Sequence, residues 1–571
     1  MLLLLSDGSV MAQQAPSGTT FSNAWYRLTP VNGSYVAGQW TAMASMNQQR
    51  LFYSSVVLQD GRVFVAGGEY GSNGTRTPPG GTPNSIYLAS AEIYDPKTNV
   101  WTALPAVPSS WSSPGNPFAF GDSIATLLPN GNVLIGPVYP NGGNRCAIYD
   151  VANNAWIDGA LYLNGVSQNE SSWLKLPDGS VLTVPQNSTA AQRFLPATNQ
   201  WVNDGSLPST IYSSLGSEVG SAHFLSNGKG FFIGANGNTA LYTPSGGVLP
   251  WTAGPGLPTV PQNTLDNNGV PNGSFNTTGA APDASAATLP NGRLLLALSG
   301  PLYNDMRAGT TPPGATNNFW LNAKNPLFAT PTSFFEYDPV STAFTPVSGP
   351  TGPTDNIPAY QGIMLALPDG SILYSDYGSQ LYVYRSSGTP LPAGKPAVNS
   401  IAANGDGSFH LTGTGLNGIS FGASFGDDAQ MDTNYPIVRL NDSSNNAFYA
   451  RTFNWSSNSI ATGSLPVTTE FTLPNSIFFG GPSTYSLVAV ANGNPSNPVT
   501  FFGPLWVDFT FTGTSTGTFA QPYKTFASGT AAVPVGGTVI FKGPRSSAET
   551  VTSFNKPVTL ISYGGAVTIG Q

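Results

Sequence analysis

Acidic and amide side chains recur at one position of a repeated segment in this 571-residue chain. In four copies, the residue eight positions before an Asp-Gly or Asn-Gly pair is Asp122, Glu170, Asp283 or Gln361. Tyr53 stands seven positions before its own pair, and Tyr360 immediately precedes Gln361. Carboxylates that converge repel one another unless they are protonated, paired or bound to a cation. If the fold brings the three acids together, their oxygen atoms would suit Ca²⁺.

The elements that must position these side chains are short paired strands. Seven times in residues 1–395, an apolar run, an Asp-Gly or Asn-Gly pair and a second apolar run follow one another, which is typical of a two-residue β-hairpin. The pairs are Asp7-Gly8, Asp60-Gly61, Asn130-Gly131, Asp178-Gly179, Asn227-Gly228, Asn291-Gly292 and Asp369-Gly370. A second hairpin with a trailing aromatic residue separates the copies, as in Ile93 to Trp101, and a degenerate one at 381–385 comes last. Two hairpins make a four-stranded blade, so the sequence predicts a seven-bladed β-propeller over 1–395.

Gly67-Gly68 and the trailing Trp101 resemble the kelch repeat in particular. From residue 396 the period stops, and the strand-like stretches 409–415 and 484–493 resemble the immunoglobulin-like domain that follows the propeller in galactose and glyoxal oxidases. We therefore expect an all-β chain with an immunoglobulin-like β-sandwich over 396–512. Residues 513–571 resemble the first coils of a pectin-lyase-like β-helix and are too few to bury a core alone, so we expect them to pack on the sandwich or to be a fragment of a longer solenoid.

The chain reverses direction at each strand of an antiparallel blade, so successive loops lie alternately on the two faces of the propeller. The short Asp-Gly and Asp-Pro turns share one face, and the long insertions at 70–90, 104–121, 252–282 and 300–332 share the other. Binding residues concentrate on long loops, so the second face, called the mouth, is the candidate site. Its predicted residues are Tyr53, Asp122, Glu170, Asp283, Tyr360 and Gln361. The acids have two open interpretations: Asp122, Glu170 and Asp283 bind Ca²⁺, or each accepts backbone N–H bonds from the next blade and staples the ring.

The resemblance implies a copper site that this chain does not match. Those oxidases hold copper at the mouth with two tyrosines, one of them cross-linked to a cysteine, and two histidines. Here Gln361 follows Tyr360 where a histidine would stand, 168–172 lack the cross-linked tyrosine, and the sandwich loop 426–435 has no histidine. Cys146, the only cysteine, lies on an outer hairpin. We therefore expect that this chain binds no copper and lacks the oxidase activity of those enzymes. His223 is interpreted as a histidine packed in the core, and Asp432 is interpreted as part of an ordinary polar loop.

Composition excludes several classes of function. The net charge of −8 and the pI near 4.7 argue against a nucleic-acid partner, which needs a basic face. No run approaches the about 18 apolar residues of a membrane span. Met1–Leu5 lacks the basic start of a signal peptide and fits a strand, so we expect upstream sequence that carries the export signal of an extracellular or cell-surface protein.

Two functional hypotheses remain. The first is a non-catalytic extracellular binding or cell-surface protein whose mouth recognises a glycan, another surface polymer or a surface protein. The second is a secreted carbohydrate-active enzyme, either a divergent copper oxidase with replacement ligands or a hydrolase that uses a carboxylate pair among Asp122, Glu170 and Asp283. Metal content would separate them.

Overall fold

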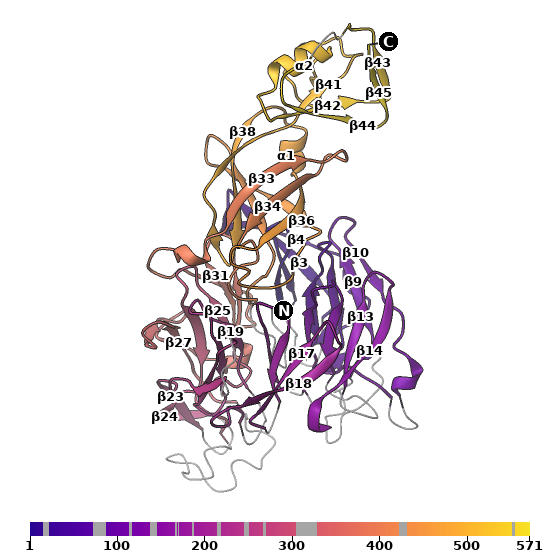
Figure 1. The fold of residues 1–571 in the computed structure, drawn as a ribbon. Helices are drawn as coiled ribbons and strands as arrows, with labels where there is room; N and C mark the ends of the chain where they lie inside the picture. The colour runs from indigo at the N-terminus through magenta and orange to yellow at the C-terminus, as the bar shows by residue number, and fades with distance from the viewer. Residues whose placement is uncertain are drawn as a thin grey trace.

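Three β-rich parts are stacked in the chain, with the propeller at one end and the C-terminal part at the other (Figure 1). The computed structural model describes residues 1–14, 22–71, 87–112, 117–137, 145–165, 168, 171–185, 188–213, 219–244, 250–265, 270–303, 328–421, 431–550 and 554–570. Among them, no helix is both long and apolar enough to cross a membrane.

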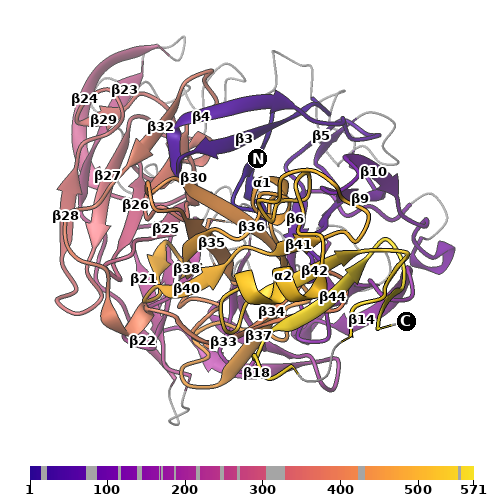
Figure 2. The same ribbon diagram turned by 90° about the horizontal axis from the view of Figure 1, so that it is seen from above.

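Seven sheets surround the axis of the propeller, as the view from above shows (Figure 2). The strands of blades 1 to 3 are β1 (Leu2–Leu4), β2 (Val10–Gln13), β3 (Trp25–Val31) and β4 (Ser34–Ala42); β6 (Ser54–Val57), β7 (Val63–Ala66), β9 (Ala91–Asp95) and β10 (Val100–Ala103); and β11 (Ile124–Leu127), β12 (Val133–Gly136), β13 (Arg145–Asp150) and β14 (Ala155–Leu161). Those of blades 4 and 5 are β15 (Ser172–Lys175), β16 (Val181–Val184), β17 (Ala190–Leu195) and β18 (Gln200–Ser206); and β19 (Ala222–Phe224), β20 (Gly230–Ile233), β21 (Thr239–Tyr242) and β22 (Trp251–Ala253).

Blade 6 is the largest blade and blade 7 the smallest. They contain β25 (Ala286–Thr288), β26 (Leu294–Leu298), β27 (Thr332–Tyr337), β28 (Phe344–Val347) and β29 (Thr354–Asp355); and β30 (Ile363–Ala366), β31 (Ile372–Ser375) and β32 (Leu381–Tyr384). Two further two-stranded sheets, β5 (Arg50–Leu51) with β8 (Tyr70–Gly71) and the hairpin of β23 (Thr259–Leu265) with β24 (Pro271–Thr278), stand outside the blades.

The seven predicted hairpins are present, but each loop has three residues and not the expected two. In the first, the N–H of Leu5 donates to the carbonyl of Ser9, and the N–H of Gly8 donates to the carbonyl of Leu5. The glycine of each of the seven pairs has a φ between 75° and 85°, a backbone conformation that glycine adopts without the steric cost other residues incur. The first strand of each blade then pairs antiparallel with the second, and both are buried. Turn chemistry alone therefore sets the start of every blade.

Aromatic pairs link the third and fourth strands of five blades. Each pair lies at one register position, with ring centroids 4.9–5.3 Å apart: Tyr94–Trp101, Tyr149–Trp156, Phe194–Trp201, Tyr242–Trp251 and Tyr337–Phe344. In blade 1, Leu28 faces Trp40 at the same position. Aromatic cross-strand pairs stabilise neighbouring strands, so these pairs bind the fourth strand to its blade.

Cys146 lies on β13 in the contact between blades 3 and 4. Its side chain is buried with Tyr162, Trp173 and Trp201, and burial raises the pKa of the thiol to about 12. The thiol is therefore protonated and inaccessible at neutral pH.

A large curled sheet forms the sandwich. Its strands are β33 (Ala397–Ala403), β34 (Phe409–Thr414), β35 (Ile437–Asn441), β36 (Ala447–Phe453), β37 (Pro466–Thr472), β38 (Thr484–Ala491), β39 (Asn494–Pro495) and β40 (Val499–Phe502). The order β33-β34-β37-β36-β35-β38-β39 brings apolar residues of both halves into one core, among them Leu411, Val438, Ala450 and Leu487.

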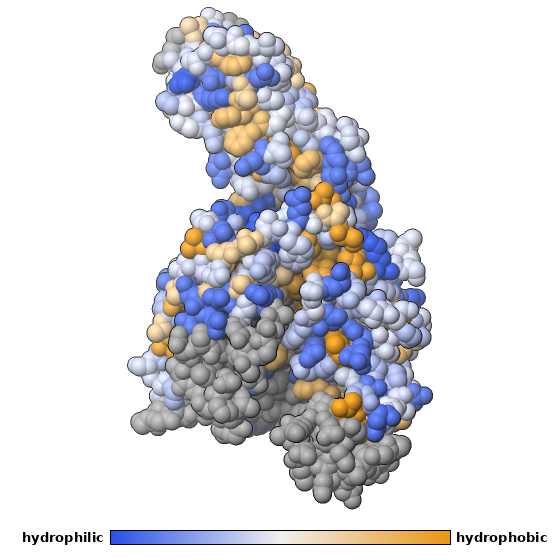
Figure 3. Space-filling view, turned by 180° about the vertical axis from the view of Figure 1, so that it is seen from behind, coloured by the Kyte–Doolittle hydropathy of each residue, from blue (hydrophilic) through white to orange (hydrophobic). Residues whose placement is uncertain are grey.

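The C-terminal part pairs its strands in parallel, as expected for β-helix coils. Its elements are β41 (Leu505–Val507), α2 (Phe526–Ala532), β42 (Thr538–Lys542), β43 (Arg545–Ser547), β44 (Thr559–Tyr563) and β45 (Val567–Ile569), in sheets β41-β42-β44 and β43-β45. It begins at Leu505, within the range expected for the sandwich. Trp506 is fully buried against Phe478 and Phe479, at and just after the end of α1 (Asn475–Phe478), so this part packs on the sandwich. Apolar residues, orange in Figure 3, are also visible on its surface.

The sandwich covers the face of the propeller that carries the short turns. Arg451 donates to the backbone carbonyl of Asp60, and the hydroxyl of Tyr435 donates to the carbonyl of Leu4. Asn458 likewise donates to Leu128, 2.9 Å away. The mouth therefore lies on the side of the propeller away from the sandwich.

Candidate ligand-binding mouth

Tyr53 is held at the mouth by a hydrogen-bonded chain between blades 1 and 2. It immediately precedes β6, and its hydroxyl donates to Oε1 of Gln13 on β2 at 2.8 Å. Nε2 of Gln13 in turn donates to the carbonyls of Ser22 and Arg50, each at 2.8 Å. The ring of Tyr53 is 1% exposed, so its orientation is set by packing as well as by this chain.

Tyr360 and Gln361 lie together in the short 3-10 turn Ala359–Gln361 that leads into β30. Nε2 of Gln361 donates to the Tyr360 hydroxyl at 3.0 Å, and the Tyr360 ring lies 4.5 Å from the ring of Phe328. Tyr360 and Tyr53 line one cavity of about 30 Å³. The structure thus brings two of the six predicted site residues together.

Of the predicted acids, Asp122 and Asp283 do not line this cavity. Asp122 and Asp283 are 7% and 6% exposed, and the backbone N–H of Asp283 donates to the Val219 carbonyl of blade 5 at 3.0 Å. Glu170 lies outside the described residues. Within the described ranges, no three His, Cys, Asp or Glu side chains are close enough to share a metal ion. Because Glu170 is not among them, the Ca²⁺ site stays a prediction.

Serines near the acidic positions link neighbouring blades. Ser54 Oγ lies 3.0 Å from Ser123 Oγ, between blades 2 and 3. Ser172 Oγ donates to the carbonyl of Gly220, and Ser285 Oγ donates to Gly362 at 2.5 Å. Serine recurs six or seven positions before the turn in these blades, and this recurrence was the signal in the sequence for a link between blades. Such a link had been expected only of the acids.

A cavity of about 510 Å³, called here the mouth cavity, adjoins the small one between blades 1 and 7. The two share Met1, Gln13, Leu51, Ile363 and Tyr377. The rest of the lining is Leu2, Ala12, Gln14, Ser22, Tyr26, Trp40, Arg50, Ser375, Gly378, Ser379 and Leu381. Aliphatic and aromatic side chains form most of its wall, amides and hydroxyls form the rest, and Arg50 is the one charged side chain among the described residues that line it.

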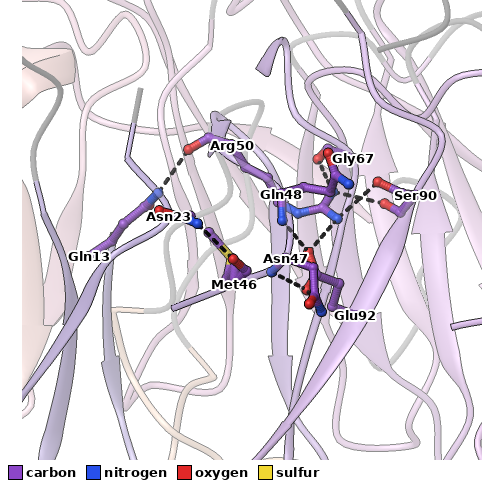
Figure 4. A network of polar contacts seen from close by, with 9 residues as sticks. All are labelled: Gln13, Asn23, Met46, Asn47, Gln48, Arg50, Gly67, Ser90 and Glu92. Atoms are coloured by element: carbon purple, nitrogen blue, oxygen red, sulfur yellow. Dashed lines mark hydrogen bonds and ion pairs between the residues drawn. The ribbon is translucent and has the colours of Figure 1, made fainter. Parts of the chain in front are cut away.

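The charge of Arg50 is satisfied away from this cavity (Figure 4). Its side chain is fully buried, and Nη1 donates to the carbonyls of Gly67 and Ser90 at 2.6 and 2.9 Å. Nη2 donates to Ser90 Oγ at 3.0 Å and to Oε1 of Glu92 at 2.9 Å. Burial lowers the pKa of Arg50, and the Glu92 carboxylate opposes that shift. Glu92 therefore balances the charge of the guanidinium, and no other described residue that lines the cavity has a charged side chain.

Glu92 completes the network on its other side. Its carboxylate accepts from the backbone N–H and Nδ2 of Asn47, at 2.7 and 2.6 Å, and from the N–H of Gln48 at 3.2 Å. Sequence reasoning missed this pair, although Arg50 and Glu92 are among the few charged residues that fall in apolar strand patterns.

His223, Asp432 and Lys175 are buried titratable groups in the contact between the sandwich and the propeller. His223 Nδ1 lies 3.4 Å from Oδ2 of Asp432, and both side chains are fully buried. Asp432 also accepts from the backbone N–H of Thr288 at 2.9 Å and from its hydroxyl at 2.5 Å. His223 is packed, as expected, but Asp432 is an interdomain contact and not an ordinary polar loop. Lys175 donates to the carbonyls of Leu127 and Asn458, and burial lowers its pKa to about 7.

Comparisons with known proteins match the repeat and the fold. The family model for the kelch motif matches residues 50–108, which hold blade 2 together with Arg50 and Glu92. The human Kelch-like protein 33 is 34% identical over 70 residues, a match that covers 12% of this chain and 10% of that protein. A solved fungal alcohol oxidase of the AA5 family, in complex with copper, aligns with a TM-score of 0.43 and 14% identity over 88% of this chain and 96% of its own.

Proposed function

We propose that this chain is a non-catalytic binding protein that takes a neutral glycan in the mouth cavity. The observation that carries the proposal is that Arg50 is the one charged side chain in the described lining of this cavity and that it is paired. Arg50 is paired with Glu92, and the other polar lining residues of this cavity are amides, hydroxyls and backbone. An uncharged ligand with many hydroxyl groups matches such a wall without leaving an ion unpaired.

The aromatic residues support a sugar ligand. Tyr26 is 38% exposed at the wall of the cavity, and Tyr377 lines both cavities. Aromatic faces give apolar contact to the C–H face of a sugar ring, while Ser375 and Ser379 line the same wall with hydroxyl groups. Together they provide the mixed apolar and hydrogen-bonding contacts that a pyranose needs.

The test is binding of neutral and anionic oligosaccharides by the full chain, measured by calorimetry. We expect neutral oligosaccharides to bind, to be recovered intact, and to bind with little dependence on salt between 0.05 and 0.5 M NaCl. Tyr26→Ala should weaken binding about three- to tenfold, since an aromatic contact contributes about 0.5–1.5 kcal/mol. The control is Ile157→Ala, which removes an exposed side chain of blade 3 far from the cavity.

Three results would contradict the proposal. One is binding confined to anionic glycans with a steep salt dependence. Another is conversion of the bound sugar to a new product, which would favour an enzyme. The third is a Tyr26→Ala variant that binds as tightly as the unmodified chain.

A further inference from the structure

The sandwich contacts all seven blades through two short segments, 431–436 and 451–459, called here the clasp. It reaches blade 5 through the pair of Asp432 and His223, and each of the other six blades through at least one hydrogen bond. These bonds join Tyr435 to Leu4, Arg451 to Asp60, Asn458 to Leu128, Ser459 to Pro177, Asp432 to Thr288 and Met431 to Ala366. The clasp therefore holds the turn face of the whole ring.

Lys175 lies where the clasp meets blades 3 and 4. It is the last residue of β15, and it is 2% exposed. Its Nζ donates to the carbonyl of Leu127 in blade 3 and, at 2.9 Å, to the carbonyl of Asn458 in the clasp. The ring of Phe421, also from the sandwich, has its centroid 5.1 Å from Nζ. Blade 3 and two segments of the sandwich thus surround the nitrogen atom of a lysine from blade 4.

The acceptors around Lys175 match a neutral amine. An amine has two N–H groups for the two carbonyls, whereas an ammonium has three and would leave one without an acceptor among the described residues. The Phe421 ring attracts a cation, but this attraction is small beside the cost of burying a charge. Burial lowers the pKa of Lys175 to about 7, and no charged residue in the described part of the chain opposes that shift. Above pH 7 the closed contact therefore holds the amine uncharged.

The other charged or titratable groups of this contact are directed elsewhere. Asp432 accepts from the backbone N–H and the hydroxyl of Thr288, and it faces Nδ1 of His223 at 3.4 Å. Arg451 donates to a turn carbonyl of blade 2. The described neighbours of the Lys175 nitrogen are therefore carbonyls and an aromatic ring, with no carboxylate to balance a charge.

Opening of the clasp changes what surrounds Lys175. The Asn458 carbonyl and the Phe421 ring leave with the sandwich, and water reaches Nζ. A solvated lysine has a pKa of about 10.4, so the open form binds more protons than the closed form between about pH 7 and 10. Protons therefore favour the open form in that window. Below pH 7 the closed form is protonated too, and Lys175 adds no further dependence on pH.

We propose that the clasp is a proton-sensitive device, in which protonation of Lys175 releases the sandwich from the turn face and deprotonation fixes it there. The sandwich leaves as a unit because its strands share a core of their own, and the blades keep their own strand pairs. The inference goes beyond the proposed glycan site, since the mouth lies on the other side of the propeller and Lys175 lines neither of its cavities.

Hydrogen exchange of the full chain, read by mass spectrometry, measures this opening. The backbone N–H groups of Asn454 and Ala366 donate across the contact, to Gln59 and Met431 at 2.6 and 2.7 Å, so they exchange when the contact opens. After correction for the intrinsic exchange rate, their opening equilibrium constant should fall up to about tenfold per pH unit between pH 7 and 9. The amides that pair β12 with β13 should exchange at least about tenfold more slowly, because an open clasp leaves blade 3 intact.

Two variants test the role of the amine. Lys175→Met cannot bind a proton, so the opening constant of the same amides should not depend on pH. Lys175→Gln retains two N–H donors for the two carbonyls and serves the same purpose if Lys175→Met does not fold. The control is Lys524→Met, which removes an exposed lysine of the C-terminal part and should keep the pH dependence of the unmodified chain.

The proposal is wrong if the opening constant of the unmodified chain does not change with pH, or if its pH dependence persists in both variants of Lys175. It is also wrong if the amides of Asn454 and Ala366 exchange no faster than those between β12 and β13. Such a result would show that the sandwich leaves only when the whole chain unfolds.

Discussion

The two faces of the propeller use the same repeat in opposite ways. On the turn face, sandwich side chains such as Arg451 and Asn458 donate to turn carbonyls, and the residues at the axis are fully buried. On the mouth face, the buried Arg50 and the half-buried Gln13 make hydrogen bonds that hold the walls of an open cavity in place. Buried polar contacts thus close one face and shape the other, so burial of a charged residue does not by itself mark a binding site.

The largest expected effect is at the mouth. Arg50→Met leaves the Glu92 carboxylate buried without its cation, and breaking a buried ion pair in this way costs about 3–5 kcal/mol. The free energy of unfolding, measured by denaturant titration, should fall by that amount. The double variant Arg50→Met/Glu92→Leu should recover part of the loss, because it removes both charges. A loss below about 1 kcal/mol in the single variant would show that the mouth does not rely on this pair.

A smaller loss is expected at the turn face. Asp432→Ala removes the acceptor for the N–H and hydroxyl of Thr288 and the partner of His223, and each buried donor left unsatisfied costs about 1–3 kcal/mol. Thermal unfolding should then separate into two steps as the sandwich loosens from the propeller. Asp432→Asn keeps one carbonyl acceptor and should lose less. If both variants unfold in one unchanged step, this cluster does not hold the interface.

The smallest effect, taken per pH unit, concerns the titration of Lys175. Burial lowers the pKa of Lys175 to about 7 in the folded chain, well below its unfolded value of about 10.4. The unfolded state therefore binds more protons between these values, and stability rises with pH in that window. The cost of the buried charge is fully present below pH 7. Relative to Lys175→Met, the free energy of unfolding of the unmodified chain should rise by up to about 1.4 kcal/mol per pH unit between pH 7 and 9. Parallel pH profiles would contradict this.

The fold was predictable because its signals are local. Asp-Gly pairs need positive φ at the glycine and fix each hairpin, so seven pairs gave seven blades. In the described residues blade 7 has three strands, and the only sign of this in the sequence was the degenerate hairpin at 381–385. The contact of the sandwich with the turn face was not predictable. Sandwich side chains donate to backbone carbonyls of the turns, and because every residue has such a carbonyl, the turn sequence carries no sign of the contact.

The candidate site was predictable only in part. Tyr53 and Tyr360 line one cavity because both stand just before an innermost strand, although they lie seven and nine residues before their turns. The Arg50–Glu92 pair joins residues from different strands of the same repeat at unequal positions, so no spacing rule connects them. Asp122 and Asp283 show the limit of register arguments, because they share a sequence position and are both buried, yet neither lines the cavity that Tyr53 and Tyr360 line.

The thiol of Cys146 can report when the contact between blades 3 and 4 opens. Because it is the only cysteine and is buried and protonated in the contact between blades 3 and 4, a thiol reagent can label only molecules in which that contact has opened. The rate of labelling under native conditions therefore measures how often blades 3 and 4 separate from each other. A cysteine introduced at Val340, which is 84% exposed, would react far faster and could carry a dye while Cys146 stays unlabelled.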